Sequence, residues 1–80
     1  MNKPNIDRAE KVAESAFAPH QQRVVSEKVE LDDRLSKLSA FFGTPTFSNL
    51  DEREKERLTV QASIMGDYSR ILGERIAAFA

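Results

Sequence analysis

The sequence predicts an all-α fold: an antiparallel two-helix hairpin with coiled-coil-like packing and a short N-terminal helix, assembled into an oligomeric bundle. Three observations support this prediction. Apolar residues recur at spacings of three and four over two long stretches, as on one face of a helix. The few Gly and Pro residues punctuate the ends of these stretches. The two stretches also match each other in step when the chain is folded at residues 43–48.

The N-terminal segment, residues 1–18, is predicted to be an arm that contains a short amphipathic helix from Ile6 to Phe17. Its apolar residues recur every three or four positions between charged ones. Pro19 disfavours helical geometry at Ala18, which therefore becomes a joint, and Pro19 suits the first position of the next helix. Residues 19–80 are assigned to the hairpin, with its loop at about 43–48.

The two hairpin helices are predicted over residues 19–42 and 49–78. Gly43 is a candidate left-handed C-cap for the first of them, followed by a Thr-Pro-Thr stop. Phe47 is expected to close this end of the hairpin, and Ser48 is the candidate N-cap of the last helix.

The apolar stripes of the two helices predict the register of the hairpin. Folding the chain back at the loop aligns seven layers without a slip. These layers pair Leu38 with Leu58, Leu35 with Gln61, Leu31 with Met65, Lys28 with Tyr68, Val24 with Leu72, Gln21 with Arg75, and Phe17 with Phe79.

The last helix also has a face of small residues, and this face predicts self-association. Gly66 and Gly73 each cost up to about 1 kcal/mol relative to Ala inside a helix, and a smooth surface for another backbone gives a reason to keep them. A homo-oligomer is favoured, and a monomeric three-helix bundle with the arm folded over this face is the alternative. The face consists of Ala62, Ser63, Gly66, Ser69, Gly73 and Ala77.

Composition excludes several classes of protein. Twelve Lys and Arg against thirteen Asp and Glu give a net charge of -1, which argues against non-specific nucleic-acid binding. The absence of Cys removes disulfides, thiolate nucleophiles and the usual zinc frameworks. No apolar run reaches the roughly 20 residues that span a bilayer, and no signal peptide precedes the first helix. A cytoplasmic protein that does not bind the membrane is expected.

The sequence shows none of the patterns that catalysis requires, so the chain is predicted not to be an enzyme. His20 is the single histidine, and it is either a surface residue or an anion contact at a helix start. No nucleophile has a suitable histidine, no glycine-rich phosphate loop is present, and Asp32-Asp33 alone is a weak metal site. No cofactor and no metal are expected.

The polar residues of the predicted interface allow two interpretations. Lys28, Gln61 and Arg75 stand where Leu would add stability, and such residues often fix helix register. Alternatively, cationic groups gather near the open end of the hairpin and, with two aromatic rings, hold an anionic planar ligand such as a nucleotide. The candidate ligand-binding residues are His20, Arg23, Lys28, Tyr68, Arg70, Arg75 and Phe17.

Two stretches resemble a family of small helical phage proteins first grouped around a crAss-like phage. The similarity extends from about His20 to Phe79, and it is carried by the run His20-Gln21-Gln22-Arg23-Val24-Val25, by Glu27-Lys28 and Glu30-Leu31, and by Gln61, Met65, Tyr68-Ser69, Leu72 and Arg75-Ile76. More remotely, Leu58-Thr59-Val60-Gln61 and Met65 resemble the helical-hairpin sponge proteins with which phages disarm CBASS and Thoeris defence.

The second resemblance implies an oligomer that sequesters cyclic nucleotide signals between subunits, in the cytoplasm of the host cell. Those sponges grip the ligand with an aromatic residue and a lysine near the N-terminal half. Phe17 and Lys28 are the nearest counterparts here, and no tyrosine stands at that place. The expected function is therefore a phage anti-defence sponge for a cyclic oligonucleotide or related second messenger. The alternatives are a hairpin that inhibits a host protein by direct binding, and a structural virion or replication accessory protein.

Overall fold

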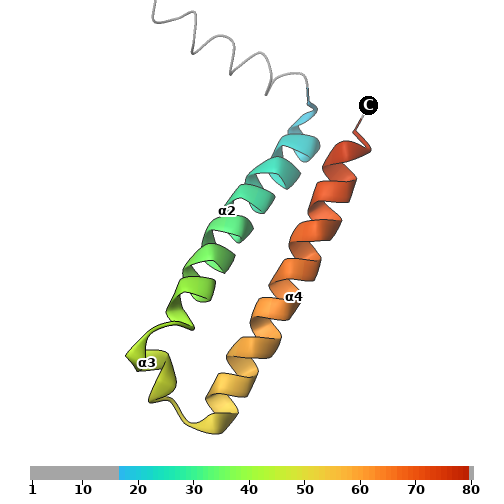
Figure 1. The fold of residues 1–80 in the computed structure, drawn as a ribbon. Helices are drawn as coiled ribbons and strands as arrows, with labels where there is room; N and C mark the ends of the chain where they lie inside the picture. The colour runs from blue at the N-terminus through green and yellow to red at the C-terminus, as the bar shows by residue number, and fades with distance from the viewer. Residues whose placement is uncertain (1–16, 80) are drawn as a thin grey trace, which may run out of the picture.

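The computed structural model describes residues 17–79, and helices are the only regular secondary structure within them. Two long helices, α2 (Pro19–Phe41) and α4 (Glu52–Ala77), are joined by a short helix, α3 (Pro45–Ser48). Figure 1 shows α4 returning alongside α2, and these two helices pack together. The predicted all-α class is confirmed. The predicted helix from Ile6 lies outside the described residues, except for Phe17, and the division into arm and hairpin stays a prediction.

The start of α2 follows the predicted joint. Ala18 is extended, with φ −66° and ψ 159°, and Pro19 is the first helical residue. The side chain of Gln21 accepts a hydrogen bond from the Ala18 backbone N–H at 2.8 Å. This bond satisfies a donor that the helix itself leaves unpaired.

The turn between the long helices differs from the prediction at Gly43. No glycine among the described residues has a positive φ, and the C-cap of α2 is Phe42, in ordinary right-handed geometry. The prediction of a left-handed cap at Gly43 was therefore wrong. The chain turns instead through α3, whose N-cap Thr44 accepts from the Phe47 N–H at 3.2 Å and donates to the Phe41 carbonyl at 2.7 Å.

Aromatic rings close this end of the α2–α4 pair. The Phe47 ring lies edge-to-face against Phe42, with centroids 4.9 Å apart, and against Phe41 at 6.0 Å. Asp51 then caps α4 by accepting from the Glu54 N–H at 2.9 Å. The prediction of Ser48 as this cap was wrong because Ser48 is already the last residue of α3.

The α4 surface that faces α2 is rotated by one residue at three of the seven predicted layers. Gln61, Tyr68 and Arg75 are exposed. The residues that follow them in the sequence are less exposed: Ala62, Ser69 and Ile76. These three share the less exposed side of α4 with the residues that the other layers predicted, which are Leu58, Met65, Leu72 and, just beyond the helix, Phe79. The change replaces large polar groups at the interface with small or apolar ones.

One predicted layer agrees with the structure, and both members of a second are buried. The Phe17 and Phe79 rings meet edge-to-face with centroids 5.6 Å apart. Val24 and Leu72 are the buried apolar residues of the described chain, at 6% and 0% exposure. The layer of Lys28 with Tyr68 differs, because the ammonium of Lys28 is bound by Ser69 and Tyr68 bonds to Glu27.

The predicted small-residue face is partly used within the chain. Ser69 is buried, and a Cβ at Gly73 would lie 3.5 Å from Cε of Lys28. A Cβ at Gly66, in contrast, would meet no atom within 4 Å. A Cβ at Gly73 would therefore make an ordinary van der Waals contact with Lys28, and no contact within the described chain requires glycine at either position. The predicted homo-oligomer stays a prediction.

Replacement of Leu72 tests the packing of the α2–α4 pair. Leu72→Ala removes a fully buried side chain, so we expect a loss of about 2–5 kcal/mol in the free energy of unfolding. Urea unfolding followed by circular dichroism, at one protein concentration, measures this loss. The control is Val29→Ala, because Val29 is 64% exposed and its loss should change stability by no more than about 0.5 kcal/mol. Equal effects of the two changes would contradict this packing.

Candidate functional site

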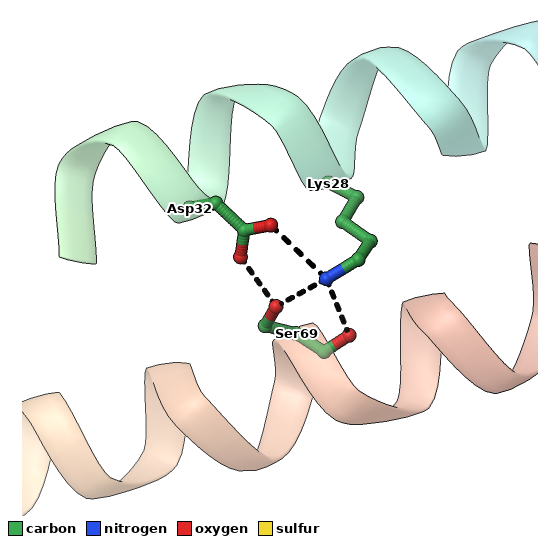
Figure 2. A network of polar contacts seen from close by, with 3 residues as sticks. All are labelled: Lys28, Asp32 and Ser69. Carbon is green, nitrogen blue, oxygen red and sulfur yellow. Dashed lines mark hydrogen bonds and ion pairs between the residues drawn. The ribbon is translucent and has the colours of Figure 1, made fainter. Parts of the chain in front are cut away.

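The most connected polar group between α2 and α4 is formed by Lys28, Asp32 and Ser69, here called the Lys28 cluster (Figure 2). The Lys28 ammonium donates to Asp32 Oδ2 at 3.0 Å, to Ser69 Oγ at 2.7 Å and to the Ser69 carbonyl at 3.3 Å. Ser69 Oγ in turn donates to Asp32 Oδ1. An ammonium has three donors, and all three have acceptors here.

The cluster is only partly removed from solvent. The Lys28 side chain is 30% exposed and that of Asp32 is 46% exposed, whereas Ser69 is buried. The hydrogen bond from Ser69, followed by that from Lys28, lowers the pKa of Asp32 below its usual value. Lysine four residues before aspartate is the less favourable order for a helical ion pair, so the pair adds little to the stability of α2 itself. Its main effect is to join α2 to α4.

Tyr68, one residue before Ser69, makes a second link between the helices. Its hydroxyl donates to a carboxylate oxygen of Glu27. This bond raises the pKa of Tyr68 above 10.0, while the positive charge of Arg75 acts in the opposite direction. The tyrosine is 43% exposed. Part of its surface is therefore open to other groups.

The remaining candidate residues lie at or near one end of the pair. The Phe17–Phe79 contact places the start of α2 beside the end of α4. His20 is in the first turn of α2 and Arg75 in the last turn of α4, and both are exposed. Arg23 and Arg70 are also exposed, and Arg70 forms an ion pair with Glu74 at 2.7 Å. Convergence of these residues on one ligand stays a prediction.

Sequence reasoning did not select Asp32 and Ser69 as partners of Lys28. The spacing of four between Lys28 and Asp32 was a visible signal for an ion pair on one helix. Ser69 carried no such signal, because its role depends on the rotation of α4. Within residues 17–79, no group of His, Asp and Glu side chains could hold a metal ion. No helix in this range has both the length and the apolar character that a membrane span requires.

A stripe of exposed apolar side chains follows α4 beside its interface with α2. Val60 is 56% exposed, Ile64 61%, Tyr68 43% and Ile71 41%. We call these four residues the outer stripe. Their spacings of four, four and three place them on one helical face. A shallow hollow lined by Arg53, Glu56, Arg57 and Val60 adjoins the start of the stripe. A helix with two apolar faces is suited to contact two neighbours.

Acid titration tests the Lys28 cluster. The carboxylate of Asp32 has a lowered pKa in the folded state, so its stabilising effect is present above its unfolded pKa of about 3.9 and is lost as the pH falls further. We expect the parent to exceed Asp32→Asn in urea midpoint at pH 7, and the difference to shrink below about pH 4. Ser69→Ala, which removes the main cause of the lowered pKa, should reduce this pH dependence. A difference that is constant down to pH 2 would show that the carboxylate is not stabilised by folding.

Comparison with known proteins gives one match. The profile of the family described as Sequestin matches residues 18–78, which include α2, α3 and α4 in full. No curated protein and no solved structure matches.

Proposed function

Because the chain belongs to the Sequestin family, we propose that it sequesters a cyclic oligonucleotide or a related nucleotide second messenger without transforming it. The family match is the observation that carries this proposal: the family name suggests sequestration, which is binding and not catalysis. The resemblance of residues 58–65 to phage sponge proteins points to the same ligand class. The proposed setting is phage defence against bacterial immunity, in the cytoplasm of the host cell.

The proposed ligand site is the end of the pair where α2 begins and α4 ends. His20, Arg23 and Arg75 are exposed near this end and offer contacts to phosphate groups. Tyr68 and Phe17 offer ring faces to a base. Lys28 is further along α2 and already has an anionic partner in Asp32.

Two of the proposed ligand-binding side chains must give up a partner within the chain when a ligand binds. Arg70 is paired with Glu74, and Tyr68 donates to Glu27. Both Arg70 and Glu74 are about 60% exposed, and exposed ion pairs contribute only about 0–1 kcal/mol. A phosphate contact to a cation is stronger, about 1.5–3 kcal/mol. The Arg70–Glu74 pair is therefore a weak competitor for a phosphate group.

Self-association through the outer stripe completes the proposal. Val24 and Leu72 alone are buried apolar residues in the described chain, which is a small core for two long helices. The outer stripe is the next apolar surface of α4. A second copy of the chain carries the same apolar stripe and is present wherever the chain is made, so it is the partner that we propose. Burial of the outer stripe in a homo-oligomer supplies the missing core.

A protein–protein inhibitor is the second candidate function, favoured by the same outer stripe. Large exposed apolar groups bounded by charges are typical of protein docking surfaces. In this case a host protein covers Val60, Ile64 and Ile71, and the chain is a monomer before it binds. The oligomeric state of the free chain therefore separates the two candidates.

Substitution in the outer stripe tests self-association. We expect Ile64→Glu to convert an oligomer into monomers in light scattering after size-exclusion chromatography, because a carboxylate at an apolar contact loses its hydration. Val29→Glu makes the same kind of change at an equally exposed position of α2 and should leave the mass unchanged. A monomeric parent chain at all concentrations would favour the inhibitor.

Arg75→Ala tests the ligand site. We expect a thermal-shift screen of cyclic di- and trinucleotides and ADP-ribose derivatives to identify a ligand that is recovered intact. Arg75→Ala should then weaken its binding by roughly 10- to 150-fold in calorimetry, the loss of one charge-assisted contact. Arg53→Ala removes the same charge at the opposite end of α4 and serves as control. Binding that is unchanged in Arg75→Ala, or hydrolysis of the ligand, would overturn the proposed site or the proposed class of function.

A further inference from the structure

We infer that Lys28 and Ser69 form an anion site in which the carboxylate of Asp32 takes the place of a ligand phosphate and leaves when that phosphate binds. This inference rests on the proposed function, since it assigns one subsite of the sequestered nucleotide. Asp32 then regulates the site as an internal competitor. Its removal should strengthen binding, the opposite of the effect expected for a residue that grips the ligand.

The two oxygens of the Asp32 carboxylate are held as two phosphate oxygens would be. Lys28 Nζ donates to Oδ2 at 3.0 Å, and Ser69 Oγ donates to Oδ1. Figure 2 shows both donors converging on the carboxylate from the opposite helix and from the preceding turn of α2. An ammonium together with a hydroxyl is a donor pair of the kind that proteins use for phosphate.

Both donors are positioned by contacts that do not involve Asp32. Ser69 is 8% exposed in the interface. Lys28 Nζ also donates to the Ser69 carbonyl. The Cε atom of Lys28 lies 3.5 Å from the position that a Cβ on Gly73 would occupy, so the side chain lies against α4. Departure of the carboxylate therefore leaves a half-buried ammonium and a hydroxyl in place without an anion. One N–H of the ammonium and the hydroxyl hydrogen of Ser69 are then available to another anion.

Asp32 itself is free to leave. Its side chain is 46% exposed and belongs to the same helix as Lys28, so it can turn toward solvent without any movement of α2 against α4. An ion pair this exposed is weak because water competes for both groups. A phosphodiester matches the carboxylate in charge and in its two non-bridging oxygens, and a phosphate monoester or pyrophosphate offers more oxygens and more charge.

The surface around Ser69 leaves room for a ligand to approach. Gly66 and Gly73 are one turn before and one turn after Ser69 on α4, and a Cβ at Gly66 would meet no atom within 4 Å. Lys28 Nζ would lie 3.9 Å from a Cβ at Gly73. Close approach of a ligand gives Gly66 a role that no contact within the chain provides. The competitor also selects against neutral ligands, since only an anion compensates Lys28 once Asp32 has left.

The test compares two isoelectric variants of adjacent residues with pyrophosphate as the probe. Asp32→Asn removes the competing charge and keeps an oxygen that can accept from Ser69. Asp33→Asn removes the same charge from a pair with Lys37 in which both side chains are more than half exposed. In calorimetry we expect Asp32→Asn to bind pyrophosphate at least about tenfold more tightly than the parent, and Asp33→Asn to match the parent.

Two further variants separate a local site from a general change in charge. Lys28→Met and Ser69→Ala, each combined with Asp32→Asn, should abolish the gain in affinity for pyrophosphate. Circular dichroism establishes that each variant is folded before binding is measured. An equal gain in Asp32→Asn and Asp33→Asn, a gain that survives Lys28→Met, or no gain at all overturns the inference.

The outcome for the anion site and the outcome for the proposed function are independent. If Asp32→Asn gains pyrophosphate affinity while the parent and this variant bind no cyclic nucleotide, the anion site stands and the sponge is wrong. If the parent binds a cyclic nucleotide and Asp32→Asn binds neither it nor pyrophosphate more tightly, the sponge stands and the competitor is wrong.

Discussion

A pair of helices has only one interface in which to bury apolar surface, and the described chain depends on this constraint. Val24 and Leu72 are its buried apolar residues, and aromatic contacts close both ends of the pair, Phe17 with Phe79 and Phe42 with Phe47. Hydrophobic stabilisation scales with the apolar area removed from water, so a core of this size is small. A second layer that covers the outer stripe would add what the pair lacks.

The polar contacts between α2 and α4 limit how the helices can slide or rotate. Lys28 is held at Ser69, and Glu27 accepts from Tyr68, so two successive residues of α2 bond to two successive residues of α4. A shift by one residue would leave both sets of groups without these partners. The same groups provide the chemistry of the proposed ligand site. In this arrangement, fixing the register and binding an anion are two properties of one cluster and need not be alternatives.

The proposed sponge and the proposed oligomer are linked through α4. One face of this helix packs on α2, and the neighbouring face carries Ile64 and Ile71 in the open. Tyr68 belongs to the outer stripe and bonds to Glu27, so a copy seated on the stripe lies beside residues proposed to contact the ligand. Assembly and ligand capture would then be coupled, because both involve Tyr68.

The sequence by itself determined the all-α class, the start of the first long helix at Pro19, and the pairing of Phe17 with Phe79. These features follow from local rules: apolar spacing, the geometry of proline, and the length of chain between two stripes. The conformation of the turn was not predicted correctly, because Thr44 and α3 replace the left-handed Gly43 that the pattern suggested.

Only the tertiary structure decided which face of α4 meets α2. A helix turns by about 100° per residue, so the stripe through Gln61, Tyr68 and Arg75 and the stripe one residue later have the same periodicity. Spacing alone cannot separate two such stripes. Lys28 reaches the small Ser69 across the interface and donates to its hydroxyl, and this contact favours the second stripe. For the same reason the sequence pointed to Lys28 but not to Asp32 and Ser69, whose roles exist only once the two helices are packed.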